Sequence, residues 1–128
     1  MNAEELKNRT KLFALRILRL AQALPNTIEG RAIRGQLVRA GTSVGANYRA
    51  ACRGRSKAEF IAKIGVVEEE SDESAFWLEV IIEGAFLKEV RVRPLLDEAN
   101  AITKIMSKSR VSASRNMTKD QTTKSGKR

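Results

Sequence analysis

Apolar residues recur along most of the chain at alternating steps of three and four residues, the spacing of helices that pack along one side. The first run covers residues 3–24, where Asn2 is placed to cap a helix and Pro25 to end it. A second run covers residues 28–52 and has Asn26 as its expected cap. Both runs predict amphipathic helices.

Two further runs complete a predicted four-helix protein. The third begins at the capping box Ser56-Lys57-Ala58-Glu59 and extends to about residue 89. Pro94 fits the first turn of the fourth helix. Beyond residue 111 the periodicity is lost, and Ser, Thr, Lys, Asn and Gly predominate. We therefore expect an all-α domain over residues 1–111 and a disordered basic tail over residues 112–128.

The third predicted helix carries two stripes on nearly opposite sides. One stripe is suited to the core, and we interpret the other as a subunit interface, because a helix of a small monomer needs one buried face. The interface prediction comprises Val66, Glu69, Glu73, Phe76 and Val80. The alternative is a helix buried all round, which a domain of about 110 residues is too small to achieve.

Several polar or small residues fall at predicted core positions. We expect a structural polar layer, more a device for helix register than a catalytic site, because buried amides and hydroxyls need partners. Its predicted members are Ser43, Asn47, Ser71 and Ser74. Four glycines in residues 28–52 indicate either close approach of another backbone, which we favour, or a break in the helix.

The formal net charge is +9, and its distribution is uneven. Residues 31–57 carry seven positive charges and no negative one, whereas residues 59–89 carry nine negative and two positive charges. A cationic surface attracts polyanions by long-range potential and counterion release. The acidic helix between basic neighbours also indicates ion pairing between helices.

We predict a nucleic-acid-binding surface on the second helix and the turn after it, with a solvated basic face and acidic-protein binding as competing interpretations. The candidate residues are Arg31, Arg34, Arg39, Arg49, Arg53, Arg55 and Lys57. Tyr48 is the sole aromatic residue in positions 14–59 and is expected to face inward. Its orientation argues for contact with the backbone of a nucleic acid rather than for base stacking.

The composition argues against most enzyme chemistry. The sequence has no histidine, the commonest general base and metal ligand. The carboxylates of residues 68–73 spread around a helix, so we expect ion pairs with neighbouring helices or subunits rather than a metal site. We predict no catalytic residue, metal or other cofactor. The lone Cys52 and the lack of a membrane-spanning run or signal peptide favour a cytoplasmic protein without membrane contact.

Several motifs resemble the four-helix-bundle proteins encoded in intervening sequences of bacterial 23S ribosomal RNA genes. The similarity covers roughly residues 5–110. Its specific parts are Ser43-Val44-Gly45-Ala46-Asn47 and Ser56-Lys57-Ala58-Glu59-Phe60, with Leu24-Pro25, Glu68-Glu69-Glu70-Ser71-Asp72-Glu73 and Trp77-Leu78-Glu79 around them. Many members read Ala-Glu-Gly where this chain reads Arg49-Ala50-Ala51, so no role of that glutamate transfers.

The resemblance implies an up-down four-helix bundle that assembles into a ring of five, a homopentamer. A related group, the accessory proteins of diversity-generating retroelements, works with a reverse transcriptase and nucleic acid. Two hypotheses follow. The first is a non-enzymatic oligomer that binds RNA or DNA. The second is an adaptor that holds a protein encoded nearby, such as a reverse transcriptase.

Overall fold

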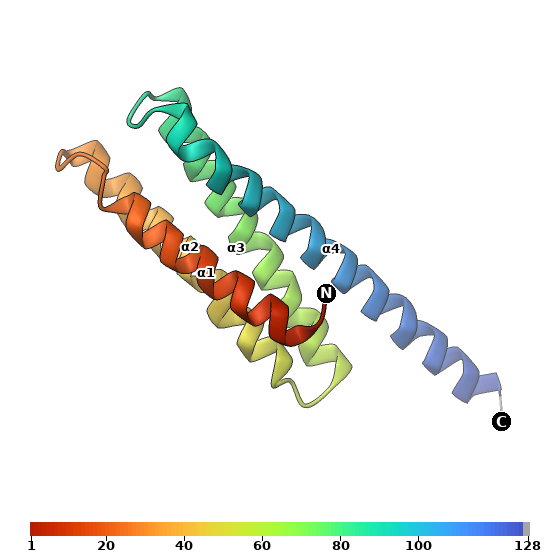
Figure 1. Cartoon of the computed structure of the whole chain (residues 1–128). Coiled ribbons are helices and arrows are strands. Elements are labelled where there is room, and N and C mark those ends of the chain that lie inside the picture. The colour runs from red at the N-terminus through yellow and green to blue at the C-terminus, as the bar shows by residue number, and fades with distance from the viewer. Residues whose placement is uncertain (127–128) are drawn as a thin grey trace.

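The computed structural model describes residues 1–126, with side chains for residues 1–118, and this part of the chain forms four helices and no strand. The helices are α1 (Ala3–Ala21), α2 (Ile28–Cys52), α3 (Lys57–Glu83) and α4 (Glu89–Gly126). Short turns reverse the chain after each of the first three helices, giving the up-down arrangement of Figure 1. The prediction of an all-α four-helix bundle is confirmed.

Local side chains set the starts of the first three helices. Asn2 accepts a hydrogen bond from the Glu5 amide at 2.9 Å, and Ser56 accepts one from the Glu59 amide at 3.1 Å, as the sequence predicts. The cap of α2 is Thr27, which accepts from the Gly30 amide at 3.0 Å, and not the expected Asn26. A threonine immediately before the first helical residue takes the role that its neighbour was expected to have.

The apolar stripes predicted to face inward form the core. Of the stripe expected to face inward on α3, six residues from Ile64 to Ile81 are almost fully buried, including the hydroxyl-bearing Ser71 and Ser74. The largest buried side chains of the other helices include Phe13, Ile17, Leu37, Val44, Val92, Ile102 and Met106. Burial of such aliphatic and aromatic groups is the main favourable term in folding.

The end of α3 differs from the expected boundary near residue 89. The helix ends at Glu83, and Ala85 adopts a left-handed conformation with φ of 57°. The Phe86 amide donates to the Ile81 carbonyl, and the Ala85 amide donates to the Ile82 carbonyl, each at 3.0 Å. These two bonds form a Schellman motif, which closes the helix earlier than the apolar periodicity indicates.

Helix α4 is longer in both directions than expected. It begins at Glu89, so Pro94 lies inside the helix rather than at its start. Among the residues whose side chains are described, Met106 is the last buried one. The sequence predicts a disordered tail over residues 112–128, but the structure continues α4 to Gly126 beyond the bundle (Figure 1), and residues 127–128 lie outside the described part. No proline or glycine interrupts residues 112–125, so backbone hydrogen bonds can continue without tertiary packing.

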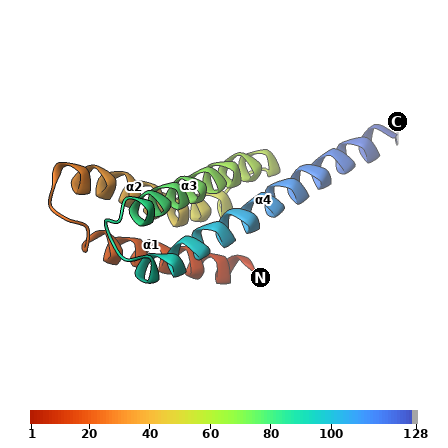
Figure 2. The same cartoon turned by 90° about the horizontal axis from the view of Figure 1, so that it is seen from above.

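Each helix contacts two others. Contacts join α1 with α2, α2 with α3, α3 with α4 and α1 with α4, and within the described residues α1 does not contact α3. Figure 2 shows α2 and α3 on one side of the bundle and α1 and α4 on the other. Helices α1 and α3 are therefore diagonal partners, and their outer faces point away from each other. No described helix is long and apolar enough to cross a bilayer.

Candidate nucleic-acid interface

The seven basic residues predicted to bind nucleic acid do not form one free surface. Arg34 points to the end of α1, where its guanidinium donates to the carbonyls of Ala21 at 3.2 Å and Leu24 at 2.7 Å. Ala21 is the last residue of α1, and its carbonyl also accepts from the Leu24 amide at 3.2 Å, so Arg34 adds a second donor at the helix end. Arg34 therefore caps the C-terminal end of α1 and has a structural role.

Arg39 is likewise paired with residues of the same chain, at the surface between α2 and α3. Its guanidinium forms ion pairs with Glu70 and Glu73 of α3, and the hydrogen bond from Arg39 holds the pKa of Glu73 below its ordinary value. Arg31, at the start of α2, donates to the side-chain and backbone oxygens of Asn26 at 3.2 and 3.3 Å. The acidic helix therefore neutralises part of the basic helix, as the charge pattern indicates.

Three of the predicted arginines, Arg49, Arg53 and Arg55, are exposed and have no side-chain partner among the described residues. Arg49 and Arg53 line a cleft between α1 and α2 together with Lys11, and neither arginine has an ion pair among the described residues. The same cleft contains Glu4, which pairs with Lys7 at 3.2 Å. Arg55 is exposed in the turn before α3, next to the exposed Lys57 at the helix start.

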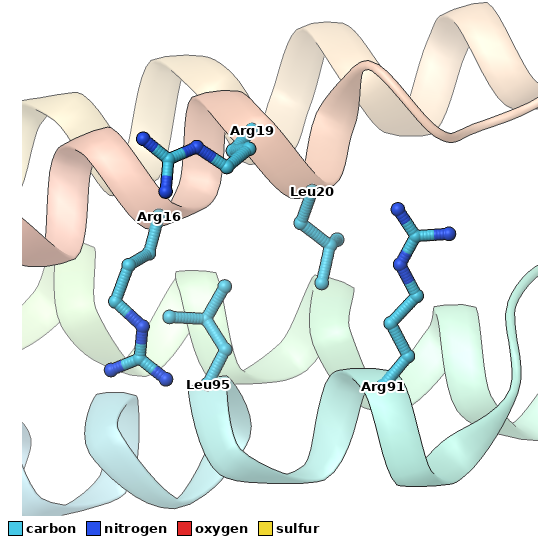
Figure 3. Close-up of a pocket in the computed structure, with 5 residues that line it drawn as sticks. All are labelled: Arg16, Arg19, Leu20, Arg91 and Leu95. Atoms are coloured by element: carbon cyan, nitrogen blue, oxygen red, sulfur yellow. The ribbon is translucent and has the colours of Figure 1, made fainter.

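A second basic cleft, which the sequence analysis did not predict, lies between α1 and α4. Arg16 and Arg19 of α1 and Arg91 of α4 surround it, and Leu20 and Leu95 form its apolar lining. Figure 3 shows Arg16 extending from α1 towards α4 and Arg91 extending from α4 towards α1. The cleft has a volume of about 260 Å³.

The electrostatics of this cleft favour an anionic ligand. No carboxylate lines it, and the three guanidinium groups form no ion pair or hydrogen bond within the described residues. A guanidinium group stays protonated at all physiological pH values and offers five donors in a planar fork that suits phosphate. Three such groups around one cleft repel each other, and a bound phosphate relieves that repulsion.

The sequence holds a weak signal for this site. Arg16, Arg19 and Arg91 have no acidic residue three or four positions away, so none of them can pair within its own helix. Arg9, on the same helix, is different because Glu98 of α4 binds it through two contacts of 2.8 and 2.6 Å. The convergence of Arg91 with α1 depends on helix packing and cannot be obtained from a local pattern.

The predicted interface residues lie on the outer face of α3. Phe76 is 53% exposed and packs edge-on against Trp77 with ring centroids 5.0 Å apart. Glu69 is exposed, Val66 and Val80 are half-buried, and Glu73 is half-buried beside Arg39. The face therefore presents an aromatic ring among carboxylates.

The predicted polar layer is split between separate contacts. Ser71 forms the link between helices, with its hydroxyl 2.8 Å from the Thr103 hydroxyl of α4, whereas Ser74 donates to the Glu70 carbonyl of its own helix. Asn47 is half-buried and donates to the Ser43 carbonyl at 2.9 Å, and the Ser43 hydroxyl donates to the Arg39 carbonyl. A polar layer with these four members would join Asn47 to the serines of α3, but the described residues show no such bond, because each side chain reaches a carbonyl of its own helix.

The acidic cluster of α3 forms ion pairs as expected. Glu68 accepts from the Arg110 guanidinium of α4 at 2.7 Å, and this bond lowers the pKa of Glu68. Glu69 and Asp72 have no ion pair within the described part of the chain. No three or more potential metal ligands of the described residues come together into one group.

Comparison with known proteins places these features in one family. The family profile of the 23S rRNA-intervening sequence proteins matches residues 4–108, which end close to the last buried side chain. A crystal structure of a protein of unknown function from the S23 ribosomal protein family of Bacteroides thetaiotaomicron is similar, with a TM-score of 0.77 and 30% sequence identity. The similarity covers 82% of this chain and 97% of that chain. No functionally curated protein matches the chain.

Proposed function

The chain belongs to the 23S rRNA-intervening sequence protein family, and we propose that it is a non-enzymatic homo-oligomer that binds nucleic acid through the phosphate backbone. The observation that carries this proposal is the cleft of Arg16, Arg19 and Arg91, in which three unpaired guanidinium groups meet without a carboxylate. The net charge of +9 supports it, because the excess of cations draws polyanions to the surface.

The lining of the cleft favours phosphate over bases. Its apolar side chains are leucines, and no aromatic ring is present on which a base can stack. Arginines that contact phosphates fix the position of a nucleic acid without reading its sequence. The second basic surface, with Lys11, Arg49 and Arg53, lies between α1 and α2. It offers further cations for contact with phosphates.

The homo-oligomer is proposed from the outer face of α3. An exposed phenylalanine beside a half-buried valine is an apolar surface that a neighbouring subunit can cover. The ring of five subunits implied by the family resemblance is part of this proposal. A ring repeats each basic cleft, and repeated clefts increase avidity for a long polyanion without new contacts.

A non-enzymatic role is supported by the residues that the chain lacks and by those it buries. The sequence has no histidine to act as a base. The buried Ser71 and Ser74 hydroxyls are bonded to neighbouring carbonyls and to Thr103, so they have no base that would activate them.

Fluorescence anisotropy with a labelled single-stranded RNA and a DNA of the same sequence tests the binding proposal. We expect both to bind, with little sequence preference and with an affinity that falls steeply between about 50 and 200 mM salt. A lack of binding to either polymer at about 50 mM salt would remove the proposal.

The adaptor hypothesis predicts a different result in the cell. Affinity capture of the tagged chain, repeated after nuclease treatment, separates a protein partner from a nucleic-acid bridge. If a specific protein stays bound after nuclease treatment and no nucleic acid is recovered, the chain acts as a protein scaffold. Recovery of nuclease-sensitive material supports the proposed function.

A further inference from the structure

Two outer faces of the bundle expose large apolar side chains, and they belong to diagonal helices. On α1, Leu12, Leu15 and Leu18 are 57%, 50% and 39% exposed. On α3, Phe76 is 53% exposed and Val80 lies one turn further along. Because α1 and α3 do not contact each other, these faces point to opposite sides of the molecule (Figure 2).

The charges around the two faces are opposite. No acidic residue occurs from position 6 to 28, so the leucines of α1 are flanked only by cations such as Lys11 and Arg19. No basic residue occurs from position 64 to 87, so the charged residues of α3 itself around its apolar centre are all carboxylates. From the neighbouring helices, Arg39 of α2 pairs with Glu73, and Arg93 of α4 lines a cleft with Glu79 and Glu83. The exposed carboxylates on this side of α3 are Glu69, Asp72, Glu79 and Glu83. None of these four is ion-paired within the described residues.

We propose that the α1 face of one copy, centred on Leu15, packs against the α3 face of the next copy, centred on Phe76. This inference rests on the homo-oligomer of the proposed function and adds the surface that covers α3. The occupant is a second copy because the chain itself carries an apolar face of opposite charge on the far side of the bundle.

Charge decides between this contact and the symmetric alternatives. If two α3 faces met, Glu69, Asp72, Glu79 and Glu83 of one copy would approach the same residues of the other. If two α1 faces met, cations would be brought together around the leucines. Like charges in a contact are unfavourable, whereas an α1–α3 contact places cations against carboxylates around an apolar centre.

The surface of α3 also offers a recess for a leucine side chain. Phe76, Val80 and Gly84 line a cleft together with Glu79 and Glu83. A leucine of α1 fits such an apolar surface, while Lys11 can pair with Glu79 or Glu83. An apolar side chain that fills a pocket surrounded by polar groups is a common arrangement of a binding hot spot.

A contact between two different faces is heterologous, and it propagates from copy to copy. Repetition closes into a ring when the rotation between neighbours closes, and otherwise forms a filament. Arg16 and Arg19 lie towards the α4 side of α1, where they join Arg91. In the assembly, the arginine cleft would therefore lie close to each subunit boundary.

A mixing experiment tests the pairing. Leu15→Glu blocks the α1 face with a carboxylate, and Phe76→Lys blocks the α3 face with a cation. Val90→Glu is the matched control, because Val90 is 80% exposed and belongs to neither face. Circular dichroism and thermal melts establish that all three variants fold, and light scattering with analytical ultracentrifugation measures their assembly.

We expect wild type and Val90→Glu to form the same oligomer, and each face variant alone to be a monomer. A mixture of the two face variants should associate into species of two or more chains, because one unmodified α1 face then meets one unmodified α3 face. A mixture that stays monomeric overturns the pairing. An oligomer that survives Leu15→Glu but not Phe76→Lys overturns it as well, because α3 would then contact another surface.

The outcomes separate this inference from the proposed function. If wild type is an oligomer but the mixture fails, only the α1–α3 pairing is wrong. If wild type is a monomer at micromolar concentration, the homo-oligomer itself is wrong. RNA binding is measured independently, and the monomeric Phe76→Lys variant should still bind RNA, although with lower avidity.

Discussion

Gly41 of α2 lies so close to Ile17 of α1 that a Cβ atom at Gly41 would be 2.7 Å from two carbon atoms of the isoleucine side chain. Both residues are buried in the bundle, and Ile17 is among the fully buried side chains. The predicted close approach at the glycines of α2 is thus present here, with a side chain as the neighbour. At Gly45 the neighbour is backbone, because a Cβ would lie 3.2 Å from the Thr10 carbonyl oxygen.

Alanine substitutions at two glycines of α2 should have opposite effects. Gly41→Ala forces Ile17 to move in a packed core and should lower the free energy of unfolding by about 1–3 kcal/mol. Gly35→Ala has no atom within 4 Å of the new Cβ and should raise it by about 0.5–1 kcal/mol, the gain in helix propensity. Urea unfolding of both variants measures the difference, and stabilisation by both substitutions would show that the α1–α2 contact is loose.

The end of α3 offers a stabilising substitution. Ala85 has a φ of 57°, a conformation that an L-residue with a Cβ adopts at a cost. Ala85→Gly should therefore raise the free energy of unfolding by up to about 1 kcal/mol. The control is Gly84→Ala, which places a Cβ 2.7 Å from the Phe86 ring and should destabilise. A lower melting temperature for Ala85→Gly would contradict the Schellman motif.

Two ion pairs between helices predict a loss of stability in acid. Hydrogen bonds from Arg110 and Arg39 lower the folded-state pKa values of Glu68 and Glu73, respectively. A carboxyl whose pKa is lowered by folding contributes stability above its unfolded pKa of about 4.3 and loses that contribution as pH falls through the folded value. The free energy of unfolding should therefore decrease below about pH 4.5.

Glu68→Gln provides the control for that pH dependence. The amide removes the titrating group while keeping the size of the side chain, so the decrease in acid should be smaller in the variant. Denaturant unfolding at a series of pH values measures both proteins. Identical pH profiles would mean that the pair of Glu68 with Arg110 does not form in solution.

Removal of residues 112–128 should leave the bundle folded. The last buried side chain of α4 is Met106, and the helix beyond it adds no residue to the core among those whose side chains are described. A chain ending at residue 111 should therefore keep its helical spectrum per residue and its melting temperature. A large fall in melting temperature would show that the extension of α4 packs on the bundle.

The sequence predicts the local features of this fold well and the partners of its surface charges poorly. The buried stripe of α3 from Ile64 to Ile81 and the Ser56 cap depend on residues a few positions apart, so their spacing is visible in the chain. The pairing of Arg39 with Glu73 and the reach of Arg34 to Leu24 depend on how helices pack.

The sequence does not predict the arginine cleft, for the same reason. Arg16 and Arg91 are far apart along the chain, and the packing of α1 on α4 brings them to one cleft. The outer face of α3 could be predicted because its residues share one helix, whereas the leucines of α1 were not predicted to be exposed. Helix periodicity identifies the faces, and tertiary structure decides which charges remain unpaired.

The salt dependence of RNA binding tests the central claim, that Arg16, Arg19 and Arg91 hold the phosphate backbone. The three arginines are changed together to glutamine, and Arg93→Gln is the control, because Arg93 lies on the same helix but pairs with Glu89 at 3.1 Å. The logarithm of the binding constant falls as the logarithm of the salt concentration rises, with a slope of about −0.7 per phosphate contact of a single strand. The triple variant should therefore have a slope that is shallower by about 2, whereas the control should keep a slope near the wild-type value. A triple variant that binds RNA with the wild-type slope and affinity would contradict the account.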